Sequence, residues 1–260
     1  MGKIVSLVNQ KGGVGKTTTA INLAQYLCEE GRMVLLADLD PQANATSGIG
    51  VNRKKIRGTT YDMMIRRIHP SQIIEKTSSF GYDIIPSSSD LSGASVELAN
   101  AKHREFWLLS ALKDVIPHYD YIIIDSPPSL DLLTLNVLTA SDEVIIPVQC
   151  EYYALEGLSK LLETISLVRK ALQPGLGIMG AVLTMYDKRN RLARQVVREV
   201  QDNFPGHVFS SVIPRNVRLS EAPSFGKTIL NFDRFSKGAK AYRNLAKEII
   251  KLEKGDKFTI

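Results

Sequence analysis

Cysteine and tryptophan are scarce in this chain, which has two Cys and one Trp among its 260 residues. Cys28 lies in a predicted helix and Cys150 at the end of a predicted strand. Two isolated cysteines make neither a disulfide framework nor a cysteine-based metal centre. This usage is typical of proteins that work in the reducing cytoplasm, and we expect that location here.

Long apolar runs are also missing. A transmembrane helix needs about 20 consecutive apolar residues, which the chain does not offer, and Lys3 interrupts any signal-peptide core. Near the other end, residues 251–260 contain Gly255 and have only a thin apolar face. An amphipathic membrane-binding helix is therefore not expected there. The sequence predicts no membrane contact.

The composition that remains is that of a globular protein. Its 44% hydrophobic content and its length suit a single domain of residues 1–260. The net charge of +6 is spread unevenly. Residues 188–247 hold 13 Lys or Arg and 4 Asp or Glu, whereas residues 1–187 hold 17 and 20. This concentration of positive charge predicts a surface that faces a polyanion.

Short apolar, often β-branched runs alternate with helical patterns along the whole chain. Strands are predicted at residues 3–8, 33–40, 82–86, 121–125, 143–148, 178–184 and 208–213. Helices are predicted at 18–28, 61–68, 91–100, 104–116, 131–139, 153–172, 190–203 and 236–252, with a mobile surface segment at 43–58 and a loop at 214–228. This alternation predicts an α/β fold with a mostly parallel sheet and helices on both faces.

A glycine-rich stretch joins the first predicted strand to the first predicted helix. Glycines let the backbone curl until successive N–H groups converge, and the helix N-terminus adds partial positive charge at the same point. Lys16 would reach the β- and γ-phosphates of a nucleotide, and the Thr17 hydroxyl would coordinate Mg²⁺. A dinucleotide loop is excluded because it needs glycine where Thr18 stands. We predict a nucleoside triphosphate site formed by Lys11, Gly12, Gly13, Val14, Gly15, Lys16, Thr17 and Thr18.

The loop departs from the general phosphate-binding motif at its start. Gln10 stands where that motif has glycine, and an additional lysine, Lys11, follows it. The pattern Lys-Gly-Gly-Val-Gly-Lys-Thr resembles the deviant Walker A motif of the ParA/MinD group of P-loop ATPases. The resemblance implies that Lys11 crosses a dimer interface to the phosphates bound by the partner subunit. Lys11 and Lys16 would then both place positive charge on the leaving group.

Three acids follow predicted buried strands, Asp38 and Asp40 after one and Asp125 after another. In such sheets ligands bind beyond the carboxyl ends of the strands, so these acids can converge on the glycine-rich loop. Asp125 fits a carboxylate that holds Mg²⁺. The family resemblance implies that Asp40 positions the attacking water and Asp38 supports the magnesium shell. Alternation puts Asp38 and Asp40 on the same side, so the sequence does not rank them.

A late segment, Ile-Pro-Arg-Asn-Val-Arg-Leu-Ser-Glu-Ala-Pro at residues 213–223, resembles another loop of the same family. In relatives, a proline and an asparagine of this loop contact the adenine ring. The resemblance assigns that contact to Pro214 and Asn216. It covers essentially the whole chain and is strongest with the short chromosomal ParA proteins, often called Soj. ATP and Mg²⁺ are the cofactors that it implies.

The resemblance also implies a function in DNA partitioning. ATP would bring two subunits together as a homodimer, and the dimer would bind double-stranded DNA of the nucleoid without sequence preference. A ParB-type centromere-binding protein would then trigger hydrolysis and release. Two alternatives remain open: a MinD-like regulator of cell division and an ATP-gated scaffold that seldom hydrolyses. An iron protein of the nitrogenase type is not expected, because no cysteine stands near Ser126 to hold a shared cluster.

The basic residues of the last quarter follow helical spacing. The arginines of predicted helix 190–203 share one side of it, apart from an apolar stripe of Leu192, Val196 and Val200. No base-reading motif is visible, so phosphate contact without sequence readout is expected, although a merely solvated face remains the alternative. We predict DNA contact through Arg189, Arg191, Arg194, Arg198, Arg215, Arg218, Lys237 and Lys240. Arg53, Lys54, Lys55 and Arg57 form the next candidate group.

Overall fold

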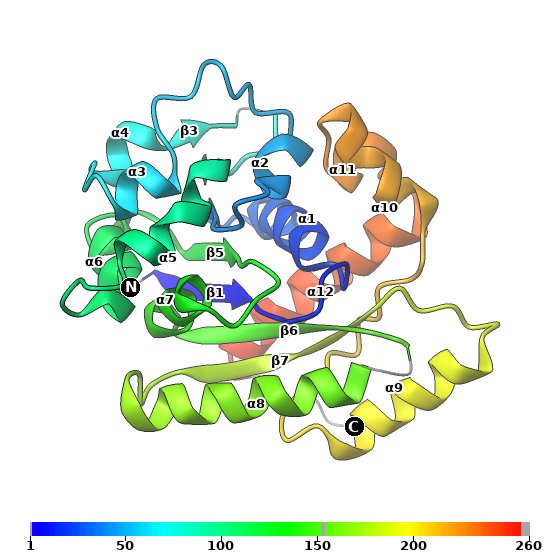
Figure 1. Cartoon of the computed structure of the whole chain (residues 1–260). Helices are drawn as coiled ribbons and strands as arrows, with labels where there is room; N and C mark the ends of the chain where they lie inside the picture. Colours follow the sequence, from blue (N-terminus) through cyan, green and yellow to red (C-terminus); the bar gives the residue numbers. More distant parts are fainter. Residues whose placement is uncertain (1, 78, 152–153, 256–260) are drawn as a thin grey trace.

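The computed structural model describes residues 2–77, 79–151 and 154–255. Within this part of the chain, seven strands form one sheet in the order β3-β4-β2-β5-β1-β6-β7 (Figure 1). The strands are β1 (Lys3–Leu7), β2 (Val34–Asp38), β3 (Glu75–Lys76), β4 (Asp83–Ile85), β5 (Tyr121–Asp125), β6 (Glu143–Gln149) and β7 (Gly177–Thr184). Only β3 runs antiparallel to its neighbour among these strands. The predicted α/β fold with a mostly parallel sheet is confirmed.

Helices cover both faces of the sheet. The larger ones are α1 (Lys16–Glu29), α7 (Leu132–Ala140), α8 (Ala154–Ala171), α9 (Arg191–Asn203) and α12 (Lys237–Glu253). Successive strand residues point to opposite faces, so Ile4 packs into one hydrophobic cluster and Val5 into the other. α7, α8 and α9 lie over the first face, whereas α1 and α12 lie over the second. Burial on both faces explains why the strands read as continuous apolar runs.

Short helices occupy several stretches where the sequence predicts something else. Residues 43–58 contain α2 (Asn44–Gly48), whose Ala45 and Thr46 are buried, so this segment is not simply a surface loop. The predicted helices at 91–100 and 104–116 are broken into short pieces: η1 (Ser89–Gly93), α5 (Ala94–Glu97), η2 (Arg104–Phe106), α6 (Trp107–Leu112) and η3 (Ile116–His118). Nearer the start, α3 (Thr60–Met64) is shorter than predicted, and α4 (Pro70–Ile73) and β3 were not expected.

The predicted strand at 208–213 is wrong. This segment lies beside β7 and makes only isolated bridges there, Ala181 to Val208 and Tyr186 to Pro214. Phe209 N and Ile213 N donate to carbonyl oxygens of β7, but between them the N–H groups of Ser210 and Ser211 donate to the carboxylate of Glu248 in α12. The predicted loop at 214–228 holds α10 (Val217–Glu221) and η4 (Ala222–Phe225), and α11 (Ile229–Asp233) follows it.

In the described ranges, none of the helices combines the length and the apolar character that crossing a bilayer requires. The predicted final helix is confirmed as α12, which ends at Glu253. The second half of the C-terminal segment 251–260, residues 256–260, lies outside the described residues.

Gly180 of β7 allows the segment at 207–209 to lie close to the sheet. A Cβ added there would stand 2.8 Å from both the carbonyl oxygen of His207 and a ring carbon of Phe209. We expect Gly180→Ala to lower the free energy of unfolding by about 1–3 kcal/mol, because overpacking forces the backbone apart. Gly157→Ala in α8 is the control: nothing lies within 4 Å of its added Cβ, so it should raise stability by about 0.5–1 kcal/mol. Urea unfolding curves of both variants measure the difference, and equal midpoints would contradict it.

Candidate functional site

The glycine-rich loop turns sharply between β1 and α1. Gly13 and Gly15 have φ of 76° and 91°, in the left-handed region that side-chain-bearing residues rarely adopt. Gly15 is the N-cap of α1, so the first N–H groups of this helix face the loop. Asn9 anchors the loop: its Nδ2 donates to the Pro147 carbonyl at 2.7 Å and its Oδ1 accepts from Lys11 N at 3.0 Å. The backbone is therefore shaped to receive an anion at the head of α1.

Lys16 lies almost buried inside this loop. Its Nζ donates to the Asn9 carbonyl oxygen at 3.0 Å and to the Lys11 carbonyl oxygen at 3.3 Å. Burial lowers the pKa of Lys16, while the negative charges of Asp125 and Asp40 act in the opposite direction. An ammonium that has few hydrogen-bond partners and little contact with water is stabilised by a phosphate placed beside it.

Asp125, at the end of β5, is fully buried. Neither of its carboxylate oxygens has a hydrogen-bond partner in the described part of the chain. Burial, together with the charge of Asp38, raises the pKa of Asp125 well above its usual range, and Thr17 and Lys16 oppose this shift. A cation would stabilise the desolvated carboxylate beside the Thr17 hydroxyl. Its oxygen ligands are the kind that Mg²⁺ prefers, so these residues fit a magnesium ion.

Asp38 has a different environment, although it is equally buried. Its Oδ2 accepts hydrogen bonds from Thr46 N at 2.8 Å and Thr46 Oγ1 at 2.7 Å, and its Oδ1 accepts from Asp40 N at 3.1 Å. Burial raises the pKa of Asp38 to about 6 against the effect of these hydrogen bonds. Both oxygens are thus occupied by the chain, so any support that Asp38 gives to a magnesium shell would be indirect.

Asp40 borders the site from the residues that follow β2. Its side chain is 5% exposed, and its Oδ1 accepts a hydrogen bond from Gln42 N at 2.9 Å. Its Oδ2 has no hydrogen-bond partner among the described residues and is the oxygen left for a ligand or a water. Of the two acids that the sequence left unranked, Asp40 lines the cavity and Asp38 does not.

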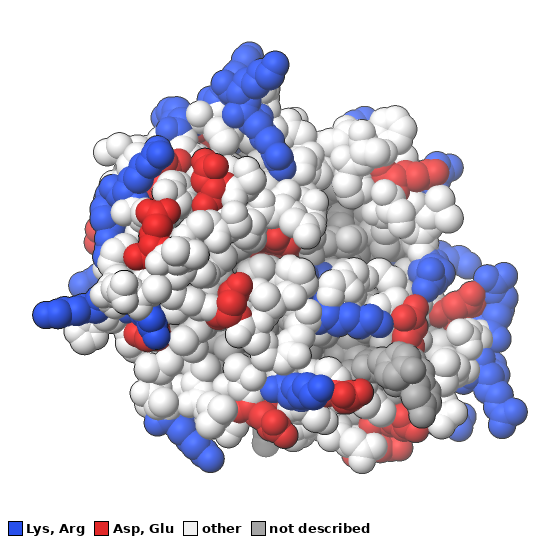
Figure 2. Space-filling view, in the orientation of Figure 1, with Lys and Arg blue, Asp and Glu red and all other residues white. Residues whose placement is uncertain are grey.

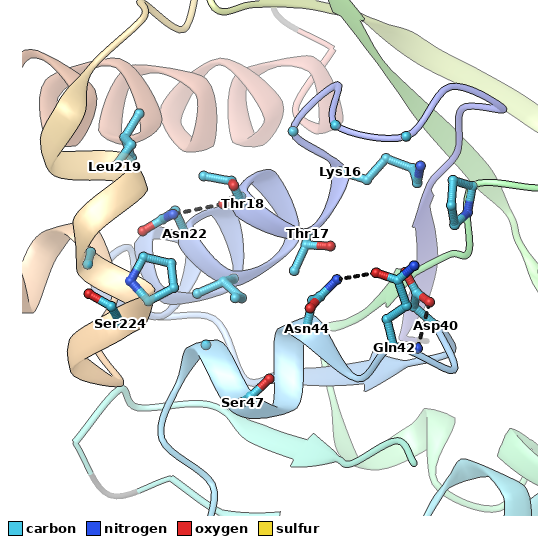
Figure 3. Close-up of a pocket in the computed structure, with 18 of the residues that line it drawn as sticks. Lys16, Thr17, Thr18, Asn22, Asp40, Gln42, Asn44, Ser47, Leu219 and Ser224 are labelled. Atoms are coloured by element: carbon cyan, nitrogen blue, oxygen red, sulfur yellow. Dashed lines mark hydrogen bonds between the residues drawn. The ribbon is translucent and has the colours of Figure 1, made fainter. Parts of the chain in front are cut away.

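A cavity of about 620 Å³ brings these elements together (Figure 3). Lys16, Thr17 and Asp40 approach it from the loop, α1 and the end of β2, while Leu219 and Ser224 approach from α10 and η4 on the opposite side. The cavity has a charged end at the glycine-rich loop and a more apolar end formed by Ile21, Met185, Leu219, Ala222 and Pro223. This shape suits a molecule with an anionic tail and a flat apolar head.

Several lining residues carried no recognisable signal in the sequence. Gln42, Asn44, Ser47 and Met185 belong to this group. Met185 has φ of 53°, an uncommon conformation for a residue with a side chain, and it lies directly after β7. A strained residue at a strand end is typical of a ligand site, but its strain is visible only in the structure.

Pro214 and Asn216 lie away from this cavity. Pro214 lines a separate hollow beside α12, and the Asn216 side chain accepts from Arg218 N at 2.9 Å as the N-cap of α10. The part of the predicted adenine loop that does line the cavity is its continuation, Leu219 to Ser224. In this conformation neither Pro214 nor Asn216 lines the cavity, and their contact with adenine stays a prediction.

Lys11 points out of its own cavity. Its side chain is 42% exposed, and its Nζ lies 3.3 Å from Glu151 Oε2. Lys16 therefore lines the cavity of its own chain, whereas Lys11 lies outside that cavity and is paired with Glu151.

The predicted DNA-contacting residues divide into two groups. Arg191, Arg194 and Arg198 are exposed on α9, and its buried side is Ala193, Val196 and Val200, so Leu192 is not part of the buried stripe. Figure 2 shows Lys and Arg gathered along the edge formed by α9 and the loop before it. The other arginines are paired with acids: Arg189 with Asp187, Arg215 with Glu151, and Arg218 with Glu221 and Asp233. Lys237 and Lys240 line the hollow of about 470 Å³ on α12.

Solved structures of known proteins share this architecture. The structure of cobyrinic acid a,c-diamide synthase from Mycobacterium smegmatis, with bound ADP and magnesium, is 37% identical with a TM-score of 0.88, and each chain covers 100% of the other. The same mycobacterial protein is also solved with an ATP analogue and magnesium.

Sequence comparison gives higher identities. Residues 2–178 match the family model described as an AAA domain. The sporulation initiation inhibitor protein Soj of Bacillus subtilis (strain 168) is 53% identical, over 96% of this chain and 98% of the relative. The chromosome partitioning protein ParA of Myxococcus xanthus (strain DK1622) is 51% identical, over 96% and 89%. With a glycine-rich loop, a buried lysine and Asp40 at one cavity, and with relatives of this identity over nearly its full length, the chain belongs to the ParA/Soj family of chromosome-partitioning ATPases.

Proposed function

We propose that this chain is a Mg²⁺-dependent ATPase that moves DNA by cycling between a DNA-bound dimer and a free monomer. ATP would join two subunits, the dimer would bind nucleoid DNA without sequence preference, and a ParB-type partner would stimulate hydrolysis and release. The observation that carries this proposal is the cavity at the head of α1, which Lys16, Thr17 and Asp40 line, together with the buried carboxylate of Asp125 beside Thr17.

The chain's own residues supply the parts that phosphoryl transfer needs. The N–H groups at the head of α1 and the Lys16 ammonium would bind the phosphates, and Thr17 and Asp125 would hold Mg²⁺. Bound Mg²⁺ supplies positive charge that neutralises the phosphate oxygens. The free Oδ2 of Asp40 would orient the attacking water, and the apolar end of the cavity would receive the base. Catalysis of this kind depends on positioning and electrostatics, and these groups provide both.

Stimulated turnover tests the proposal as a whole. We expect slow ATP hydrolysis by the chain alone and faster hydrolysis when both DNA and the ParB-type partner are added. A scaffold gated by ATP would bind nucleotide and change its oligomeric state but would show no stimulation in any combination. A MinD-like regulator would instead respond to lipid vesicles.

The first prediction concerns Lys11, which lies outside its own cavity. If it reaches the nucleotide of a partner subunit, Lys11→Ala should bind ATP with nearly unchanged affinity through Lys16 but should remain monomeric. Lys16→Ala should instead lose nucleotide affinity itself, because the buried ammonium is a direct phosphate ligand. Nucleotide titration and analytical sedimentation with ATP or ADP measure the two effects. If Lys11→Ala forms ATP-dependent dimers of normal affinity, Lys11 is only a surface lysine and has no role across a dimer interface.

A second prediction concerns Asp40. Asp40→Ala should bind Mg-ATP, dimerise and stay on DNA, because these steps need binding alone whereas release needs hydrolysis. We expect its stimulated rate to fall at least about 100-fold, the scale of losing a group that aligns a reactant. Phosphate release and DNA dissociation measure the outcome. If Asp40→Ala hydrolyses ATP at the normal stimulated rate, a group other than Asp40 must orient the attacking water.

The third prediction concerns the arginines of α9. Each phosphate contact adds about 0.9 to the slope of log affinity against log salt concentration. Arg191→Ala should therefore lower affinity similarly for unrelated DNA sequences and flatten this slope by roughly one unit, with ATP-driven dimerisation intact. Arg66→Ala is the control, since Arg66 is an exposed arginine that follows α3, is paired with Asp62 and lies outside the basic last quarter of the chain. If Arg191→Ala binds DNA as tightly as the parent across the salt range, the α9 arginines are only a solvated surface and do not contact DNA.

A further inference from the structure

The backbone of Asp40 is fixed on both sides by buried side chains. Its N–H donates to Asp38 Oδ1 at 3.1 Å, and its carbonyl oxygen accepts from Ser87 Oγ at 2.8 Å. The same carbonyl also accepts from Ala43 N at 2.8 Å. The backbone of Asp40 is therefore held by its own turn and, in addition, by the Ser87 side chain from the neighbouring strand end.

Thr46 of α2 connects Asp38, on one side of this network, with Ser87 on the other. Its Oγ1 donates to Asp38 Oδ2 at 2.7 Å and accepts from Ser87 N at 2.9 Å. Asp38, Thr46 and Ser87 all have zero exposed surface. Buried polar groups are costly unless every partner is present, so such a network has one well-defined arrangement.

The sheet order explains how Ser87 reaches this position. β4 pairs directly with β2, with Ile85 opposite Ala37, so the residues after β4 lie beside the residues after β2. Ser87 follows β4 by two residues and thus stands next to Asp40, although 47 positions separate them in the chain. No sequence motif marks this serine.

We propose that Ser87 is a positioning residue for ATP hydrolysis, acting with Thr46 to hold the main chain of Asp40. The proposal rests on the role proposed for Asp40 above. The network fixes the backbone, Gln42 N fixes Oδ1, and only Oδ2 is then left to point at a water in the cavity. A displacement of about 1 Å at such a group is enough to cost up to 100-fold in rate.

The chain offers a closely matched pair of variants to test this role. Ser87→Ala removes the hydroxyl that donates to Asp40 but leaves the Ser87 N–H bond to Thr46 in place. Ser88→Ala removes a neighbouring hydroxyl that is also buried but has no hydrogen-bond partner in the described residues. We expect Ser87→Ala to lower the stimulated kcat about tenfold, the scale of one lost hydrogen bond, with unchanged ATP affinity and dimerisation. Ser88→Ala should match the parent.

Thr46 gives a second pair. Thr46→Val keeps the shape but removes the hydroxyl between Asp38 and Ser87, whereas Thr46→Ser keeps the hydroxyl. We expect Thr46→Val to lower kcat at least as much as Ser87→Ala and Thr46→Ser to restore most of it. Should Thr46→Val fail to fold, the Ser87 and Ser88 pair still decides the question.

A readout that does not need hydrolysis separates this inference from the proposed function. Hydrogen exchange in peptides that span residues 39–47 should be faster in Ser87→Ala than in the parent and unchanged in Ser88→Ala. If Asp40→Ala hydrolyses ATP normally, the proposed role of Asp40 fails, while faster exchange would still show that Ser87 holds its backbone. If Asp40→Ala is inactive and Ser87→Ala keeps both the parental kcat and the parental exchange, Ser87 has no positioning role and the inference is overturned.

Discussion

One buried ammonium among buried carboxylates is the constraint on which this site depends. Burial lowers the pKa of Lys16 and raises those of Asp38 and Asp125, so the fold keeps charged groups where water solvates them poorly. Asp38 is compensated by hydrogen bonds from the chain, but Asp125 is not. A cation beside Asp125 and phosphates beside Lys16 would remove both deficits. Ligand binding therefore stabilises the folded chain as well as preparing it for chemistry.

The order of the strands brings these buried charged groups together at one edge of the sheet. β4, β2, β5 and β1 are adjacent and parallel, so the residues after each of them meet at one edge. β1 leads into the glycine-rich loop, β2 provides Asp38 and leads to Asp40, and β5 ends in Asp125. β4 leads to Ser87, which reaches the Asp40 backbone from the neighbouring strand. A different strand order would separate Asp125, the acid proposed to hold Mg²⁺, from Asp40, the acid proposed to orient the water.

The sequence predicted the groups that strong local patterns mark and missed those that tertiary packing decides. The glycine-rich loop and the acids after apolar runs are visible because turn geometry and strand burial restrict residue choice there. α2 and α10 are five residues long, too short for a helical period, so Thr46 and Leu219 read as loop. The segment at 208–213 looked like a strand, and Phe209 N and Ile213 N do donate to β7. No continuous ladder forms, because Glu248 of α12 accepts the N–H groups of Ser210 and Ser211 between them.

The positions of the acids among the basic residues indicate which of these basic residues would contact DNA first. Arg189 lowers the pKa of Asp187 to about 2, and Arg215 and Arg218 also face carboxylates, so a phosphate must compete with these acids for each guanidinium. Exposed pairs of this kind contribute only about 0–1 kcal/mol, so the competition is weak but not zero. The α9 arginines meet no carboxylate within ion-pair distance in the described residues, and their charge is available without rearrangement. If the chain binds DNA as proposed, we therefore expect the first phosphate contacts at α9, and we expect the paired arginines to add to them only after their acids have been displaced.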